Sequence, residues 1–108
     1  MAWLLKDDQV LAHVEIADSF GARLKGLIGR RDLEGAMLFR PAKSVHTIGM
    51  RFPIDVAYCD KHMRVLSTVT MRRLRVGRPR PKAHAVVEAR AGAFERWGLQ
   101  VGDTLEIR

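Results

Sequence analysis

The sequence is poor in cysteine and has no long apolar run. Its 108 residues include one cysteine, Cys59, so no disulfide can form within the chain. This excludes a small secreted scaffold that is held together by disulfides. No segment approaches the roughly 18 consecutive apolar residues that cross a membrane as a helix. The N-terminal apolar run, Trp3 to Leu5, is shorter than the roughly 7 to 15 residues of a signal peptide, so we expect a cytoplasmic protein.

Motifs that would name a reaction are also missing. The sequence contains neither a G-x-x-x-x-G-K phosphate loop nor a G-x-S-x-G nucleophile elbow. Cys59 and His62 have the C-x-x-H spacing of half a zinc site, but no second pair with ligand spacing accompanies them. Ser44 and His46 would share one face of a strand, yet spacing links no acid to them. We therefore expect no metal and no cofactor.

Acidic residues are outnumbered. The sequence has nineteen Lys and Arg residues and twelve Asp and Glu residues, which gives a net charge of +7. The excess gathers in residues 72–82, a segment that Gly77, Pro79 and Pro81 mark as a loop. Clustered guanidinium groups pair with phosphates, so this loop is a candidate contact for a polyanion or an acidic partner; the alternative is a solvated loop without a partner. No aromatic residue stands between the basic ones to stack on bases. The candidate anion-binding residues are Arg72, Arg73, Arg75, Arg78, Arg80 and Lys82.

What the sequence does have is the pattern of a folded β domain. Hydrophobic residues make up 47% and charged residues 29%, and 108 residues suit one core, so we expect a single domain over residues 1–108. Residues 9–16 alternate after the turn at Asp7-Asp8, which predicts a hairpin with residues 3–6. A second hairpin is predicted by alternation on both sides of the turn at 60–62. Its strands are 54–59 and 63–71, and shorter strands are expected at 35–39, 43–48, 85–89 and 104–107.

Two segments depart from this alternation. Apolar residues at helical spacing, from Phe20 to Ile28, predict one principal α-helix near residues 18–28. A short helix or turn is expected near residues 91–97, where Gly98 closes it. The sequence therefore predicts a mainly β fold of about seven short strands, as a small β-sandwich or a barrel-like domain. We expect one shared core formed by Phe20, Leu24, Leu27, Leu38, Phe39, Val56 and Val65.

The least regular passage, residues 44–55, mixes polar groups with large apolar side chains, and Pro53 prevents a helix from continuing through it. It is either a buried loop whose polar groups satisfy the backbone or the floor of a pocket that binds a small molecule. A further reading makes the protein an enzyme in which His46 and Asp55 form an acid–base pair. We favour a non-catalytic binding domain, because no nucleophile accompanies the pair. The candidate ligand-binding residues are His46, Thr47, Met50, Arg51 and Asp55.

Several short motifs follow one another in an order typical of one family. They are Gly26-Leu27-Ile28-Gly29-Arg30, Gly35-Ala36-Met37-Leu38-Phe39, Pro53-Ile54-Asp55 with Tyr58 behind it, Glu88 with Ala91-Gly92, and Gly102-Asp103. In this order the chain resembles the domain of unknown function 192 family of small bacterial and archaeal proteins. His46 and Gly49 replace the Trp and Asn of the commoner family form. The resemblance implies a compact β-sandwich or barrel with one main helix, and it implies no established activity.

Overall fold

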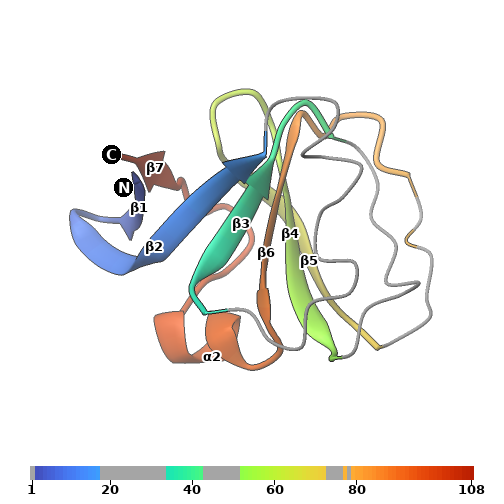
Figure 1. Cartoon of the computed structure of the whole chain (residues 1–108). Helices are drawn as coiled ribbons and strands as arrows, with labels where there is room; N and C mark the ends of the chain where they lie inside the picture. Colours follow the sequence, from blue (N-terminus) through green and yellow to red (C-terminus); the bar gives the residue numbers. More distant parts are fainter. Residues whose placement is uncertain (1, 18–33, 43–51, 73–76, 78) are drawn as a thin grey trace.

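The computed structural model describes residues 2–17, 34–42, 52–72, 77 and 79–108. Within these residues one sheet of seven strands curls into a half-barrel (Figure 1). The sheet order is β5-β4-β6-β3-β2-β1-β7. Strands hold 53% of the described residues and helix 6%, so the predicted mainly β fold is confirmed. The elements are β1 (Ala2–Lys6), β2 (Gln9–Ala17), β3 (Ala36–Phe39), β4 (Ile54–Cys59), β5 (Val65–Met71), β6 (Ala85–Arg90), α2 (Ala93–Trp97) and β7 (Glu106–Ile107).

Both predicted hairpins are present. β1 pairs antiparallel with β2 through a turn in which Asp7 and Asp8 have left-handed φ values of 51° and 65°. Short polar side chains tolerate this conformation, which suits the twist of a tight hairpin. β4 pairs antiparallel with β5, and the Asp60 carboxylate accepts hydrogen bonds from the backbone N–H groups of His62 and Arg64 in the turn between them. These contacts hold the loop without a glycine.

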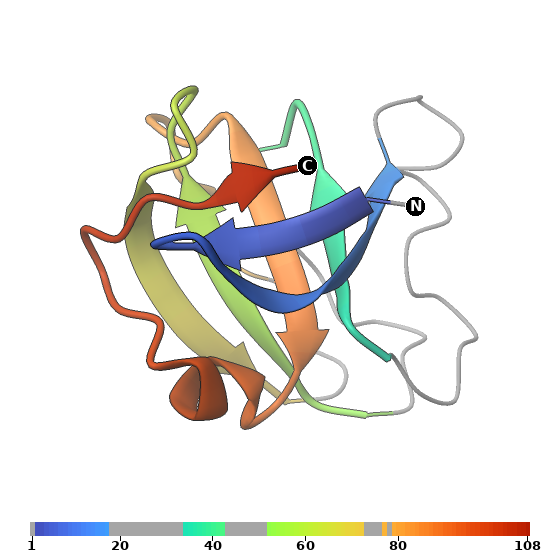
Figure 2. The same ribbon diagram turned by 90° about the vertical axis from the view of Figure 1, so that its left-hand side faces the viewer.

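The two ends of the sheet approach each other. Val65 donates a backbone hydrogen bond of 2.8 Å to the carbonyl of Asp103, and Leu105 donates one of 2.9 Å to the carbonyl of Met63. The segment that leads into β7 therefore runs beside the start of β5 (Figure 2). This pairing partly closes the barrel and leaves fewer open strand edges.

Both faces of the curled sheet are buried, so the predicted single core is wrong. Leu38 and Val65 belong to a cluster inside the curl, whereas Phe39 and Val56 belong to a second cluster on its outer face. The separation follows from the alternation of side chains along a strand. The remaining predicted core residues, Phe20, Leu24 and Leu27, lie outside the described residues. The outer cluster comprises Ala17, Met37, Phe39, Phe52, Ile54, Val56, Tyr58, Met71, Ala83 and Val86.

The predicted short helix near 91–97 is confirmed as α2, which buries Ala93 and Phe94 against the inner cluster. It lies at one end of the half-barrel (Figures 1 and 2). The predicted helix near 18–28 and the predicted strand at 43–48 lie outside the described residues. Among the residues that the structure does describe, none forms a helix that is both long and apolar enough to cross a membrane.

Candidate functional site

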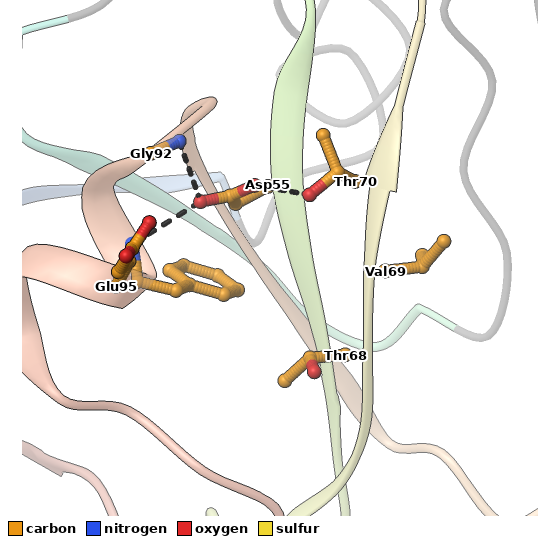
Figure 3. Close-up of a pocket in the computed structure, with 7 residues that line it drawn as sticks. Asp55, Thr68, Val69, Thr70, Gly92 and Glu95 are labelled. Atoms are coloured by element: carbon orange, nitrogen blue, oxygen red, sulfur yellow. Dashed lines mark hydrogen bonds between the residues drawn. The ribbon is translucent and has the colours of Figure 1, made fainter.

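Asp55, which the sequence singled out, is a buried carboxylate on β4 with an exposed fraction of 5%. Its side chain points away from the outer cluster and toward α2 (Figure 3). Oδ1 accepts a hydrogen bond of 2.7 Å from the Thr70 hydroxyl. Oδ2 accepts hydrogen bonds from the backbone N–H groups of Gly92 at 2.9 Å and Phe94 at 3.1 Å. Asp55 therefore links β4, β5 and the start of α2.

These contacts give Asp55 a structural role. Gly92, the N-cap residue of α2, has φ of 96° and no side chain to cap the helix, so the first N–H groups need an acceptor from elsewhere. Asp55 supplies that acceptor. A protonation cycle at Asp55 would weaken the bonds that hold α2 to the sheet. Its predicted acid–base partner, His46, lies outside the described residues.

Two hollows flank α2. One, of about 320 Å³, lies beside Asp55 between β5 and α2 and is lined by Thr68, Thr70 and Glu95 among others (Figure 3). The other, of about 410 Å³, is lined by Arg90, Arg96, Trp97 and their neighbours. Among the described residues, no buried side-chain polar atom without a hydrogen-bond partner lines either hollow.

The structure separates the other predicted site residues. Arg72 and Lys82 are exposed, at the two ends of the predicted basic loop, whereas Arg80 is half-buried against the outer face of the sheet. The turn at 80–83, in which the Ala83 N–H donates to the carbonyl of Arg80, brings that residue to the sheet. The other predicted residues lie outside the described ranges: His46, Thr47, Met50, Arg51, Arg73, Arg75 and Arg78.

Arg80 packs on a tyrosine that sequence reasoning did not propose as a site residue. The guanidinium carbon of Arg80 lies 4.9 Å from the centroid of the Tyr58 ring, and Tyr58 is completely buried. A cation over an aromatic face is an attractive arrangement. The Tyr58 hydroxyl and Arg80 Nε are nevertheless buried without a hydrogen-bond partner in the described part of the chain. Native structures leave few such atoms, so each one needs an explanation.

Glu88 is the third buried polar residue of this region. It stands on β6 opposite Val56 of β4 and Met37 of β3, on the same face as Tyr58, and its exposed fraction is 5%. Its side chain makes no hydrogen bond or ion pair with a described residue. Burial raises the pKa of the Glu88 carboxyl from 4.5 to about 8, so the group is mostly uncharged at pH 7. We call Tyr58, Arg80 and Glu88 the outer-face cluster.

The chemistry of the outer-face cluster is that of a hydrogen-bond donor site. Burial raises the pKa of the Tyr58 hydroxyl. The charge of Arg80 and the approach of its guanidinium N–H to the phenol oxygen both oppose this rise, and the charge of Glu88 adds to it, so the phenol keeps its proton at neutral pH. The cluster thus offers a guanidinium N–H, a phenol O–H and a carboxyl O–H, with one positive charge.

The half zinc spacing of Cys59 and His62 gathers no further ligand in the described residues. Cys59 is completely buried on the inner face, and burial raises the pKa of its thiol to about 12. His62 stands in the exposed turn at 60–62. No three His, Cys, Asp or Glu side chains come together over the ranges that the structure covers. Cys59 is therefore a packing residue of the strand, and its thiol is a poor nucleophile.

The sequence contained one signal for the outer-face cluster. Glu88 interrupts the apolar run of Ala85–Ala89, and a charged residue in the middle of a fully apolar strand is unusual. Tyr58 gave no such signal, because a buried tyrosine on a strand is common. Only the pairing of β4 with β6 shows that these two side chains share a face.

The half-barrel belongs to a class of folds already seen in bacteria. A protein of unknown function from Novosphingobium aromaticivorans shares it with a TM-score of 0.78 and 22% identity, over 97% of this chain and 82% of that one. A putative transcription regulator from Sinorhizobium meliloti matches with a TM-score of 0.78 and 21% identity, over 97% of this chain and 90% of that one. At such identities the likeness establishes the fold alone.

The family follows from the sequence itself. The model of DUF192, described as Uncharacterized ACR, matches residues 3–107, and the chain belongs to this family, as the motif order predicted. A UPF0127 protein from Thermococcus gammatolerans is 32% identical over 86% of this chain and 65% of its own length. One from Pyrococcus furiosus is 29% identical over 94% of this chain and 91% of its own length. The chain thus spans slightly less than two thirds of the Thermococcus relative, and both relatives are archaeal.

Proposed function

We propose that this protein is a non-catalytic domain that binds a small molecule at the outer-face cluster. The observation that carries the proposal is the burial of the Tyr58 hydroxyl and Arg80 Nε without a partner. Leaving a polar group buried and unpaired costs about 1–3 kcal/mol. A ligand that accepts hydrogen bonds from both groups would recover this free energy, and Glu88 stands on the same face to contribute a third bond.

A small ligand fits this site better than a polyanion. Arg80 Nε is buried, and the phosphate backbone of a nucleic acid reaches only exposed donors. The exposed Lys82, two residues after Arg80 in the chain, supplies positive charge instead. Such charge raises the local concentration of anions and speeds their arrival. In this proposal Arg80 binds the ligand, and the positive charge of the exposed Lys82 attracts it.

The binding role is also supported by the state of the two groups on which catalysis would depend. Asp55 holds three hydrogen bonds within the protein, and the thiol of Cys59 is buried with a raised pKa. The alternative, an enzyme that uses His46 and Asp55 as an acid–base pair, requires Asp55 to exchange a proton while it holds α2 in place.

A ligand screen on the intact protein tests the proposal. We expect small molecules that stabilise the protein in thermal-shift assays to perturb the amide NMR signals of β4 and β6 around Tyr58 and Glu88. Tyr58→Phe keeps the ring and removes only the unpaired hydroxyl, so it should weaken binding at least tenfold. Lys61→Gln, an exposed change in the turn at 60–62, should leave binding unchanged. The proposal fails if no small molecule stabilises the protein, or if Tyr58→Phe binds as well as the wild type.

The polyanion reading of the basic loop has its own test. Labelled oligonucleotides titrated at low and physiological salt would bind with a steep salt dependence if the loop contacts phosphates. The triple change of Arg75, Arg78 and Arg80 to Ser should then abolish binding. Oligonucleotide binding that Tyr58→Phe leaves intact, together with no small-molecule binding, would favour the polyanion and overturn the small-molecule proposal.

A further inference from the structure

The ligand class follows from the charges and donors of the outer-face cluster. We propose that the ligand is a small monocarboxylate, which accepts hydrogen bonds from Arg80, Tyr58 and Glu88. This inference rests on the proposed function, since it names the ligand of the same site.

Charge balance selects a monoanion. Arg80 is the one charged member of the outer-face cluster at neutral pH, because Glu88 is mostly protonated and Tyr58 is neutral. A ligand with one negative charge compensates the guanidinium. A dianion such as a phosphate monoester would bring an uncompensated charge to a site from which water is largely excluded, and such a charge is costly to bury. A cation would be repelled by Arg80.

Hydrogen-bond inventory selects a carboxylate among monoanions and excludes an amide. A carboxylate has about four acceptor positions on two oxygens and no donor, which matches a site that offers donors from three side chains. An amide would bring its own N–H donors, and Arg80 has no acceptor to receive them. Charge-assisted bonds between a guanidinium and a carboxylate are also among the stronger hydrogen bonds in proteins.

The surroundings indicate the polarity of the rest of the ligand. Val56 and Met37 stand directly opposite Glu88, and Val86 stands opposite Tyr58. All three belong to the outer cluster, so the walls beside the donors are apolar. A short aliphatic or aromatic body attached to the carboxylate suits these walls, whereas a hydroxylated body would lose its hydration without compensation.

A pH dependence follows from the same groups. Among the described residues, those that face Glu88 are Val56 and Tyr58 from β4, Met37 from β3, and Arg80 beyond the tyrosine ring. As the pH rises past about 8, Glu88 loses the proton that it would donate and gains a negative charge. Both changes oppose a bound carboxylate, so its affinity should fall at alkaline pH. Tyr58 also loses its proton at a still higher pH, which acts in the same direction.

Calorimetric titration with propionate, butyrate and benzoate tests the inference at constant ionic strength. These ligands are fully ionised at pH 6.5 and pH 9.5. Any difference in affinity between the two pH values therefore comes from a change in the protonation of the protein. We expect saturable binding at pH 6.5 that is at least tenfold weaker at pH 9.5. Glu88→Gln keeps an uncharged donor, so it should bind at both pH values with equal affinity. At pH 6.5, propionamide should bind at least tenfold more weakly than propionate. Sulfate, which is a dianion at this pH, should do the same.

The variants separate this inference from the proposed function. Arg80→Gln removes the charge and should abolish carboxylate binding, and circular dichroism checks that it folds. If Arg80→Gln does not fold, Tyr58→Phe takes its place and should weaken carboxylate binding at least tenfold. If propionamide or sulfate binds at the cluster as tightly as propionate, the carboxylate inference is overturned while the binding site stands. The carboxylate inference is also overturned if the affinity of Glu88→Gln for propionate depends on pH as strongly as that of the wild type. If no ligand of any class binds, the proposed function itself falls.

Discussion

The buried carboxyl of Glu88 makes the stability of the fold depend on pH, and Glu88→Gln should remove that dependence. Burial raises the pKa of this group from its ordinary value of 4.5 to about 8 in the folded protein. Between these values the unfolded chain has lost the proton that the folded chain keeps. The folded state therefore binds more protons, and its stability falls as the pH rises from about 4.5 to about 8. Above that range both states are ionised and the loss is complete.

The magnitude follows from the two pKa values. The difference between 4.5 and about 8, at about 1.4 kcal/mol for each pH unit, gives at most about 5 kcal/mol. This is comparable with the whole stability of a small domain, which is about 5–15 kcal/mol. Gln has nearly the same shape as protonated Glu and does not ionise. At pH 4.5 the free energies of unfolding of the wild type and of Glu88→Gln should be similar. At pH 9 the variant should be more stable by several kcal/mol.

Urea unfolding of both proteins at pH 4.5, 7 and 9 measures this difference. Other groups titrate equally in the two proteins, so the difference between their free energies of unfolding isolates Glu88. Glu95→Gln, a change at an exposed glutamate on α2, serves as the matched control and should follow the wild type at each pH. The wild type and Glu88→Gln differ in their free energies of unfolding. If this difference changes by less than about 1 kcal/mol from pH 4.5 to pH 9, the reasoning is refuted.

Three further predictions test the described structure. Asp55→Ala should destabilise the protein by about 3–5 kcal/mol in urea titration, because two buried backbone N–H groups lose their acceptor; a loss below about 1 kcal/mol would contradict its role in holding α2. Leu38→Ala should cost about 2–5 kcal/mol, since the side chain is completely buried in the inner cluster; a cost like that of a surface change would show that this packing is wrong. The Cys59 thiol should resist a disulfide reagent at pH 8 until urea unfolds the chain, because it is buried with a pKa near 12; rapid reaction of the native protein would exclude this burial.

Alternation along the sequence predicted the bounds of two strands well. The predicted strand at 54–59 matches β4 residue for residue, and β6 extends its prediction by one residue. Simple alternation along β5 would place Val65 and Met71 on the same face. An irregularity in the pairing between Tyr58 and Cys59 places Val65 opposite Cys59, in the inner cluster, while Met71 lies opposite Ile54, in the outer cluster. A bulge of this kind reverses the alternation, and nothing local in the sequence marks it.

The first long strand shows a similar limit. In the alternation that predicted the strand at 9–16, Val10 and Ile16 share a face with Val14. Val14 is buried, but Val10 and Ile16 are exposed by 58% and 37%. The pairing of β1 with β2 shifts register between Leu4 and Leu5, and β2 then continues beside β3. Which face of a strand is covered depends on these neighbours, and a single-sequence pattern does not contain them.

The candidate site was predictable in part for the same reason. Asp55 was predicted as a candidate site residue because this acid follows Pro53 and Ile54 at the start of an apolar strand. Its role emerges only when β4, β5 and α2 meet, since its hydrogen-bond partners lie 15 to 39 residues away. Arg80 was predicted as one of six equivalent basic residues. Its contact with Tyr58, from a different part of the chain, is what distinguishes it from Lys82.

The two buried acids of the described residues show how a structural carboxyl differs from one in the proposed binding site. Asp55 and Glu88 have the same exposed fraction of 5%, on opposite faces of the same sheet. Asp55 accepts three hydrogen bonds from the protein, so folding alone satisfies it. Glu88 stands among apolar side chains of the outer cluster. It shares its face with the Tyr58 hydroxyl and with Arg80 Nε, which are buried without a hydrogen-bond partner among the described residues. Over the described residues, folding alone leaves these two atoms unpaired, and the proposed ligand would offset that cost.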